Sequence, residues 1–371
     1  MKFENEYIKN ITPYKLASHK VWDEVGNDEI LKLDWNEATI PASPIVKKRV
    51  LETIDKIGFR YYPNVNNTEL NESLSKYTGL SMESILYFAS SDYAQEYIVS
   101  VFLSKDDNVL ILGPTYDNFR LACQSRGAQV HYTYYDNEFK FNLDNYKEHI
   151  GKLKPKVAYI CNPNNPTGTQ ISSKIIEDIV SNHLDTLFII DEAYIEFSSD
   201  SCSYLIDKFE NVIISRTFSK AFALANFRIG YLLSSKGIID SLNKIRNAKN
   251  INSLSQEAAI AALSDIEYTK KYVDEVLQAK EYMLKKINNL KDITAFDSKG
   301  NFLLIKCLER SVKLKIIYEF ENNNIFVRDL NHNTLSEFYF RITIGTLKQM
   351  ERVVAILENI LNEEKNEDCI C

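Results

Sequence analysis

Short apolar runs alternate with amphipathic segments between about residues 85 and 232. Brief apolar runs bounded by turn-forming residues are typical of buried strands, whereas apolar positions three or four apart are typical of helices. This pattern predicts seven strands: LYFA (86–89), NVLIL (108–112), QVHYTY (129–134), VAYIC (157–161), LFII (187–190), VIIS (212–215) and IGYLL (229–233). Helices are predicted between them over 93–104, 118–126 and 172–183. The alternation predicts an α/β fold, with a mostly parallel seven-stranded sheet flanked by helices on both faces.

The pattern changes after residue 238. Long helices are predicted over 238–249 and 254–288, then the strands FLLIKC, IFVR and FYFRITIG, then a final helix near 347–361. This order predicts a second, smaller α+β domain. The first forty-odd residues are polar and contain turn-forming prolines, as is typical of an arm. We therefore expect an N-terminal arm over 1–44, a large domain over 45–250 and a small C-terminal domain over 251–371.

Composition and charge narrow the class of protein. Of the 371 residues 45% are hydrophobic and 26% charged, as in soluble globular proteins, and no run approaches the roughly twenty apolar residues of a membrane helix. The start lacks the apolar core of a secretory signal, and the six cysteines have no paired spacing, so we expect a cytoplasmic protein with reduced thiols. A net charge of −7 argues against a nucleic-acid partner, and five dispersed histidines argue against a metal site.

Nucleotide-binding motifs are absent. The eleven glycines never occur two apart, so the chain has no Gly-x-Gly turn, and it has no Gly-Lys-Ser/Thr either. Polar groups instead follow four of the predicted strands: SSD (90–92), NPNNPTG (162–168), DEAY (191–194) and RTFSK (216–220). Ligands of parallel sheets bind beyond the carboxyl ends of the strands, which is where these four segments are expected to lie.

The first two segments have a structural and a functional interpretation. SSD can be an ordinary helix N-cap, or it can offer hydroxyls and free backbone N–H groups to an anion at the positive end of a helix. NPNNPTG can be a stiff loop, or its two prolines and glycine can hold the backbone rigidly enough to aim an asparagine side chain. Composition alone does not decide between these interpretations.

The other two segments carry charges in apolar surroundings. An acid at a strand end is commonly a surface group, but Asp191 follows a buried strand, where it would need a cationic partner. Lys220 can be a solvated lysine, but it lies among hydroxyls and the apolar FALA segment, with Arg228 downstream to clamp a phosphate. Together these segments match the groups of pyridoxal phosphate. They offer an amine in apolar surroundings, a carboxylate at a strand end, an asparagine, a tyrosine and a set of donors for a phosphate. Burial and the nearby Arg228 are expected to lower the pKa of Lys220.

The series of motifs resembles fold-type I, class I/II pyridoxal-phosphate aminotransferases, and among them the histidinol-phosphate aminotransferase family. The matching motifs cover nearly the whole chain: ITPY, LDWNE, RYYPN, SSDYA, GPTYDNF, NPNNPTG, DEAYIEF, RTFSKAFALANFRIGY, IFVRDL and RITIGT. The resemblance implies pyridoxal 5'-phosphate as cofactor and a homodimer, with the N-terminal arm contributing to the small domain and to the dimer.

The resemblance also implies roles for individual residues. Lys220, Asp191 and Tyr194 would be catalytic: Lys220 would form the Schiff base with the cofactor, Asp191 would pair with its pyridine nitrogen, and Tyr194 with Asn165 would donate to its phenolic oxygen. Tyr116 would stack on the ring. The groups that would hold the cofactor phosphate are Ser91, Asp92, Thr217, Ser219, Arg228 and, from a second subunit, Tyr62. Arg341 would bind the substrate carboxylate, and Tyr14 and Arg328 would face a distal, phosphorylated end of the substrate.

The expected function is an exchange of an amino group between a glutamate-like amino acid and a small phosphorylated keto compound. The alternative is a decarboxylase of a phosphorylated amino acid such as phosphoserine or phosphothreonine, because the orientation of the bound carboxylate decides which bond breaks. Three departures from the family border the substrate mouth and the phosphate cup: Phe88-Ala89-Ser90 in place of a glycine-rich turn, Asn226 in place of a glycine, and the segment NEATIPASP. They leave the identity of the phosphorylated substrate open.

Overall fold

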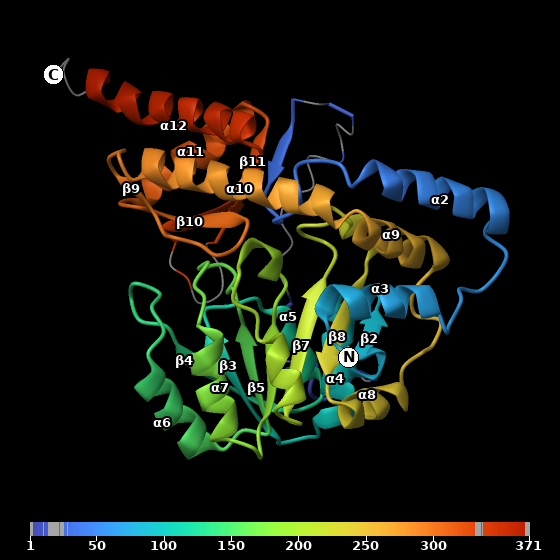
Figure 1. The fold of residues 1–371 in the computed structure, drawn as a ribbon. Coiled ribbons are helices and arrows are strands. Elements are labelled where there is room, and N and C mark those ends of the chain that lie inside the picture. The colour runs from blue at the N-terminus through green and yellow to red at the C-terminus, as the bar shows by residue number, and fades with distance from the viewer. Residues whose placement is uncertain are drawn as a thin grey trace.

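The chain folds around two β-sheets, which lie one above the other in two lobes (Figure 1). The computed structural model describes residues 3–9, 11–13, 22, 26–27, 29–330, 335 and 337–367. In the lower lobe of Figure 1 the sheet has seven strands in the order β2-β8-β7-β6-β5-β3-β4. In the upper lobe the sheet has five strands in the order β1-β11-β12-β10-β9.

The seven-stranded sheet confirms the predicted fold class. Its strands are β2 (Ile85–Phe88), β3 (Asn108–Gly113), β4 (Gln129–Tyr134), β5 (Val157–Cys161), β6 (Leu187–Asp191), β7 (Val212–Thr217) and β8 (Gly230–Ser234). Strand β8 runs antiparallel to both of its neighbours, and the pairs among β3, β4, β5, β6 and β7 are parallel. Every one of these strands begins and ends within two residues of its prediction. Six of them are apolar runs that are buried throughout or nearly so, whereas β4 is largely exposed and shows the alternation of an edge strand.

Alternate residues of the central strands pack on opposite faces of this sheet, as the two-residue period of a strand requires. Ile160 and Ile190 contribute to one core, while Tyr159 and Ile189 contribute to the other. The first face is covered by α3 (Thr68–Thr78), α6 (Leu143–Leu153), α7 (Ser173–Ser181) and α9 (Ser253–Ser264). The second face is covered by α4 (Ser91–Phe102), α5 (Asn118–Ser125) and α8 (Lys236–Asn243).

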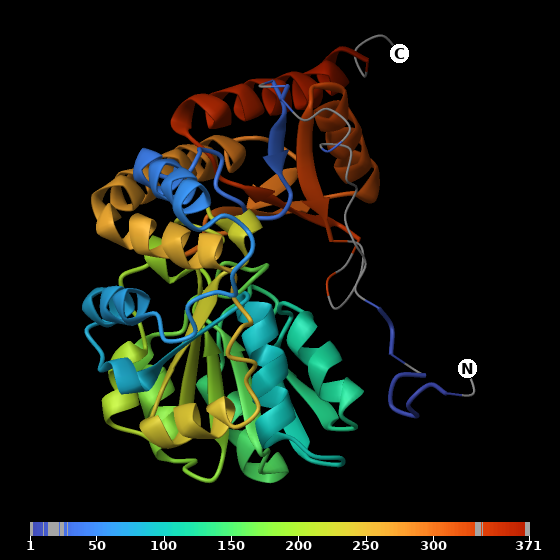
Figure 2. The ribbon, with the colours of Figure 1, turned by 90° about the vertical axis from the view of Figure 1, so that its right-hand side faces the viewer.

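The five-stranded sheet has a hydrophobic core of its own. Its strands are β1 (Leu31–Leu33), β9 (Ile293–Ala295), β10 (Phe302–Cys307), β11 (Ile325–Asp329) and β12 (Tyr339–Thr343), and its helices are α10 (Ile266–Ile287), α11 (Arg310–Asn322) and α12 (Leu347–Glu367). Figure 2 shows β1, in blue, beside the orange and red strands, and its pairing with β11 is parallel. Strands β1 and β9 were not predicted, because three residues are too few to display a period.

One predicted helix was wrong. The segment 254–288 forms two helices, α9 and α10, which are separated at Asp265. Asp265 has φ −121° and ψ 50°, outside the helical region, and its carboxylate accepts a hydrogen bond from Ser43 at the start of α2 (Pro44–Ile57). Helix α9 then contributes to the core of the seven-stranded sheet and α10 to that of the smaller sheet. The predicted domain limits remain a prediction.

Two further findings concern membranes and cysteines. Of the helices in the described part of the chain, none combines the length and the apolar character needed to cross a bilayer. The cysteines Cys123, Cys161, Cys202 and Cys307 are buried and carry free thiols.

Candidate active site

A cavity of about 500 Å³ opens at the carboxyl ends of the parallel strands, between the two sheets. Asp191 ends β6, Cys161 ends β5 and Thr217 ends β7, and all three line the cavity. Arg328 of β11 and Arg341 of β12 line it from the smaller sheet. Of the fourteen predicted site residues, the following twelve line this cavity: Ser91, Asp92, Tyr116, Asn165, Asp191, Tyr194, Thr217, Ser219, Lys220, Arg228, Arg328 and Arg341.

The remaining two predicted residues lie elsewhere. Tyr62 is 78% exposed and does not line the cavity of its own chain; its ring instead lies 4.4 Å from Nζ of Lys249. Tyr14 lies outside the described residues.

Lys220 presents its amine to the cavity. Its Nζ donates to the backbone carbonyl of Trp35 over 2.8 Å and lies 5.8 Å from the centre of the Tyr194 ring. Burial, followed by the positive charge of Arg341, lowers the pKa of Lys220 to about 8. We expected Arg228 to be the cation responsible. That expectation was wrong, because the cation with the largest effect is Arg341 of the smaller sheet, which approaches the amine only in the folded chain.

Asp191 is a buried carboxylate held by neutral donors. Its Oδ2 accepts hydrogen bonds from Gln95 Nε2 and from the Tyr159 hydroxyl, both over 2.8 Å, and its Oδ1 accepts one from the backbone N–H of Ala193 over 3.1 Å. Burial raises the pKa of Asp191 to about 6, although the Tyr159 hydrogen bond opposes that rise. None of the ion pairs found among the described residues involves Asp191, so the cation predicted from its burial does not come from the described chain.

The start of α4 and the end of β7 form a cup of donors. Ser90 precedes α4 with φ 91° and ψ 159°, a region that is essentially restricted to glycine, and its Oγ caps the helix by accepting from the N–H of Tyr93. Ser90 belongs to the segment Phe88-Ala89-Ser90, which stands in place of the family's glycine-rich turn. Ser90 keeps the glycine-like backbone, so the free N–H groups of Ser91 and Asp92 still point out of the helix start.

Hydroxyls and a guanidinium complete this cup. Thr217 and Ser219 are buried, and their hydroxyls are 3.0 Å apart. Arg228 Nη2 lies 3.6 Å from a carboxylate oxygen of Asp92. Gly230 allows the parts to come this close, because a Cβ there would lie 2.6 Å from the backbone nitrogen of Ser91. Backbone N–H groups at a helix start, hydroxyls and an arginine are the donors that bind phosphate.

Arg341 connects the smaller sheet to the large one. Its Nη1 donates to Asn165 Oδ1 and its Nη2 donates to the backbone carbonyl of Asp34 over 2.6 Å. The hydroxyl of Tyr194 accepts from Asn36 Nδ2 over 3.0 Å, and burial raises the pKa of that hydroxyl. Arg328 and Arg341 occupy directly opposite positions of β11 and β12 and are 5% and 7% exposed.

Sequence reasoning missed several residues that shape the site. They are Trp35, whose carbonyl holds Lys220; Gln95 and Tyr159, which hold Asp191; and Asn36, which holds Tyr194. Gln95 lies one helical turn after Ser91, and Tyr159 lies two residues before the end of β5, so each falls next to a segment that was singled out. Their spacing alone carries no sign of a contact with Asp191.

The donor set fits pyridoxal phosphate. A buried carboxylate with three neutral donors suits a protonated ring nitrogen, and a buried amine with its pKa near neutral suits an aldehyde. The cup at the start of α4 suits a phosphate. These three features all face one cavity, whose volume accommodates a small-molecule cofactor together with a substrate.

Comparisons with known proteins agree with this fit. The family model described as aminotransferase class I and II matches residues 28–357. The chain is similar to a dihydroxyacetone phosphate transaminase of Campylobacter jejuni, with 40% identity over 97% of this chain and 98% of that protein. It is also similar to a histidinol-phosphate aminotransferase of Methanocaldococcus jannaschii, with 33% identity over 96% of this chain and 97% of that protein.

A solved structure shows the same fold. The crystal structure of histidinol-phosphate aminotransferase from Sinorhizobium meliloti in complex with pyridoxal-5'-phosphate superposes with a TM-score of 0.87, at 22% identity, over 98% of both chains. The chain therefore belongs to the aminotransferase class I and II family, and it is an aminotransferase whose cofactor is pyridoxal 5'-phosphate.

Proposed function

We propose that this aminotransferase exchanges an amino group between a glutamate-like amino acid and a small phosphorylated keto compound of the dihydroxyacetone phosphate type. The observation that carries the proposal is the pair of buried arginines, Arg328 and Arg341, at one register position of β11 and β12. Like charges directly opposite each other in a sheet are destabilising, so a site that keeps two of them is suited to anions. Both partners of the proposed reaction carry an anionic end beyond the reacting carbon.

The roles proposed for the cavity residues are those that the family resemblance implies, and all of these residues line one cavity. Asp191 would keep a proton on the ring nitrogen, and Asn165 and Tyr194 would donate to the phenolic oxygen. Tyr116 would cover the ring. The cup of Ser91, Asp92, Thr217, Ser219 and Arg228 would bind the phosphate. When bound, the cofactor supplies the aldehyde that takes up the amino group and the ring that accepts electrons from the substrate's α-carbon.

Lys220 is the proposed proton carrier. Its amine would hold the cofactor covalently, and the same amine would move a proton to and from the substrate's α-carbon. A pKa of about 8 leaves a useful fraction of the amine unprotonated near neutral pH. Arg341 binds the α-carboxylate of the amino-acid donor, and Arg328, together with Tyr14, binds the distal carboxylate or phosphate. Each charged hydrogen bond of this kind contributes roughly 1.5–3 kcal/mol.

We also propose a cytoplasmic homodimer in which Tyr62 completes the phosphate cup of the partner subunit. One observation supports a contact surface near Tyr62: Phe59, Tyr61 and Tyr62 lie close together in the chain and are 79%, 63% and 78% exposed. Clustered exposed aromatic residues are typical of interfaces. The buried free thiols of the described cysteines suit a reducing compartment. Light scattering would measure the mass in solution. Mixing the Lys220→Ala and Tyr62→Ala proteins would test the shared site. If Tyr62 acts across the interface, a mixed dimer has one intact site and regains activity. If Tyr62 acts within its own subunit, both sites of the mixed dimer are defective.

The test of the reaction is a half-reaction with the pyridoxamine-phosphate form of the enzyme. Addition of dihydroxyacetone phosphate should restore the visible absorbance of the aldehyde form, and unphosphorylated dihydroxyacetone should do so far more slowly. Arg328→Gln should remove this preference for the phosphorylated compound. The matched control is Arg310→Gln, an exposed arginine of the small lobe that pairs with Glu337 outside the cavity. Release of carbon dioxide from phosphoserine or phosphothreonine, without a keto product, would replace the proposal with decarboxylation.

A further inference from the structure

A second buried carboxylate follows Asp191 and faces away from the cavity. Glu192 is 0% exposed and, unlike Asp191, does not line the cavity. Successive side chains of an extended strand point to opposite faces, so the orientation of one carboxylate determines the orientation of the other. The mechanism proposed above gives Glu192 no task at the reacting atoms.

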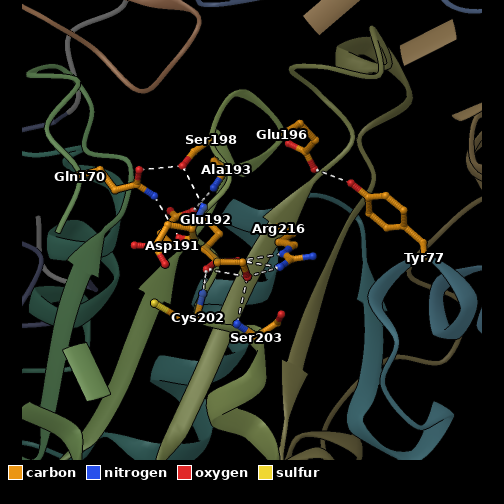
Figure 3. Close-up of polar contacts among 12 residues, drawn as sticks. Tyr77, Gln170, Asp191, Glu192, Ala193, Glu196, Ser198, Cys202, Ser203 and Arg216 are labelled. Atoms are coloured by element: carbon orange, nitrogen blue, oxygen red, sulfur yellow. Dashed lines mark hydrogen bonds and ion pairs between the residues drawn. The ribbon is translucent and has the colours of Figure 1, made fainter. Parts of the chain in front are cut away.

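Glu192 pairs with Arg216 on the neighbouring strand. Arg216 Nε donates to Glu192 Oε2 over 2.9 Å, and its Nη2 lies 2.8 Å from the same oxygen (Figure 3). Arg216 is itself buried and immediately precedes Thr217, the last residue of β7. The ion pair therefore joins the ends of β6 and β7 at positions adjacent to Asp191 on one strand and to Thr217 on the other.

Further hydrogen bonds surround the pair. Glu192 Oε1 accepts from the backbone N–H of Cys202 over 2.6 Å, and Ser201 Oγ donates to the same carboxylate. Arg216 Nη2 donates to Ser201 Oγ over 2.7 Å. The backbone N–H of Glu192 in turn donates to the carbonyl of Ser215 over 2.8 Å, which extends the pairing of the two strands past Asp191.

A buried ion pair is weak evidence for stability, because apolar residues of similar volume commonly stabilise a fold as well or better. A charged hydrogen-bonded pair does, however, fix one arrangement of the two strand ends, which apolar packing does not. That arrangement sets the distance between Asp191 and the 217–220 segment, which carries the phosphate-binding hydroxyls and Lys220. The reaction needs both ends of the cofactor held at once, so this distance matters to function.

We propose that Glu192 and Arg216 are positioning residues, whose ion pair holds Asp191 and the 217–220 segment in register with each other. This inference rests on the roles proposed above for Asp191 and Lys220. It places a polar clamp behind the sheet edge, on the side opposite the cavity.

The double variant Glu192→Met/Arg216→Met tests the proposal, because it removes both charges while keeping apolar volume. We expect it to fold with a melting temperature close to that of the unaltered protein. In the cofactor-free protein, amide hydrogen exchange should become faster in peptides covering 190–194 and 215–221 and stay unchanged in the five-stranded sheet. Turnover of the loaded enzyme should fall roughly 10²-fold, the cost of a displacement of about 1 Å. Unchanged exchange and turnover in the folded double variant would overturn the proposal.

Arg216→Lys provides a second variant should the double variant not fold. It keeps the charge but loses the guanidinium fork that binds Glu192. The same two peptides should exchange faster in it, and exchange equal to that of the unaltered protein would overturn the proposal. The control is Glu257→Gln, which breaks the Arg49–Glu257 pair between α2 and α9, outside the cavity; it should leave both peptides unchanged. Because exchange is measured without substrate, a failure of the proposed reaction would leave this test intact.

Discussion

The hydroxyl of Tyr159 offers a way to perturb Asp191 without touching the cavity. Tyr159 donates to Asp191 Oδ2 over 2.8 Å, and its ring stacks on Phe119 with the centroids 4.6 Å apart. Tyr159→Phe keeps that stacking and removes the hydrogen bond. A hydrogen bond to a charged group contributes roughly 1.5–3 kcal/mol, and one pKa unit corresponds to about 1.4 kcal/mol. The protonated carboxyl group loses a neutral hydrogen bond of about 1 kcal/mol, so the charged form loses about 0.5–2 kcal/mol more, and the variant should raise the pKa of Asp191 from about 6 by roughly 0.5–1.5 units.

The sign of the effect on stability follows from proton linkage. Because burial raises the pKa of Asp191 from 3.8 to about 6, the folded protein binds this proton more tightly than the unfolded chain does. The free energy of unfolding therefore decreases as the pH rises through that window. Tyr159→Phe extends the decrease to higher pH. Relative to the unaltered protein, the variant should lose roughly 1.5–3 kcal/mol at about pH 9, and about 1 kcal/mol at about pH 5, where the carboxyl group is protonated.

Urea unfolding of the cofactor-free protein at these two pH values measures the effect. Glu196, whose pKa burial raises to about 7, titrates in the same range, so the comparison needs Asp191→Asn as a background. In that background Tyr159→Phe should lower the free energy of unfolding by the same amount at both pH values, because no charge remains at residue 191. Equal losses at both pH values in the protein that retains Asp191 would refute the reasoning.

Further predictions concern the amine, the carboxylate and the backbone of the cup. Lys220→Ala should abolish the visible absorbance of the bound cofactor, and borohydride treatment of the unaltered holoprotein should label the 216–228 peptide; labelling elsewhere would contradict the role of Lys220. Asp191→Ala should lower kcat far more than it raises KM, by roughly 10²–10³-fold, since it removes fixed charge stabilisation; steady-state kinetics would show the split. Ser90→Gly should raise the free energy of unfolding by about 1 kcal/mol in urea titrations, because glycine adopts φ 91° and ψ 159° without strain, and a decrease would mean that the lost cap outweighs it. Gly230→Ala should cost roughly 1–3 kcal/mol and weaken cofactor binding in a fluorescence titration, because its Cβ meets the backbone of Ser91.

Local sequence pattern was enough for the large sheet and for helices α4, α5 and α7, but not for the break between α9 and α10. A central strand of the seven-stranded sheet is covered by helices on both faces, so its residues are apolar one after another, and this run is visible in the sequence. The break between α9 and α10 has no such signal. It depends on the contact of Asp265 with Ser43, which is 222 residues away in the chain.

The same distinction applies to the site. Asp191 ends a strand, and Ser91, Asn165 and Lys220 lie shortly after strand ends. The rule that ligands bind at the carboxyl ends of parallel strands therefore predicted that these residues would share one cavity. Gln95 and Trp35 follow no such rule. Their contacts with Asp191 and Lys220 join segments 96 and 185 residues apart, which only the packed chain makes neighbours.

The sequence by itself determined the sheet, its connecting segments and the kinds of polar group at the strand ends, because these depend on the period of apolar residues and on neighbouring positions. The tertiary structure alone decided the electrostatics of those groups. The pKa of Lys220 depends on burial and on Arg341 of the other sheet, and the pKa of Asp191 depends on burial and on the hydroxyl of Tyr159. Burial and charge act through space over a few ångströms, and the order of residues along a chain does not contain those distances.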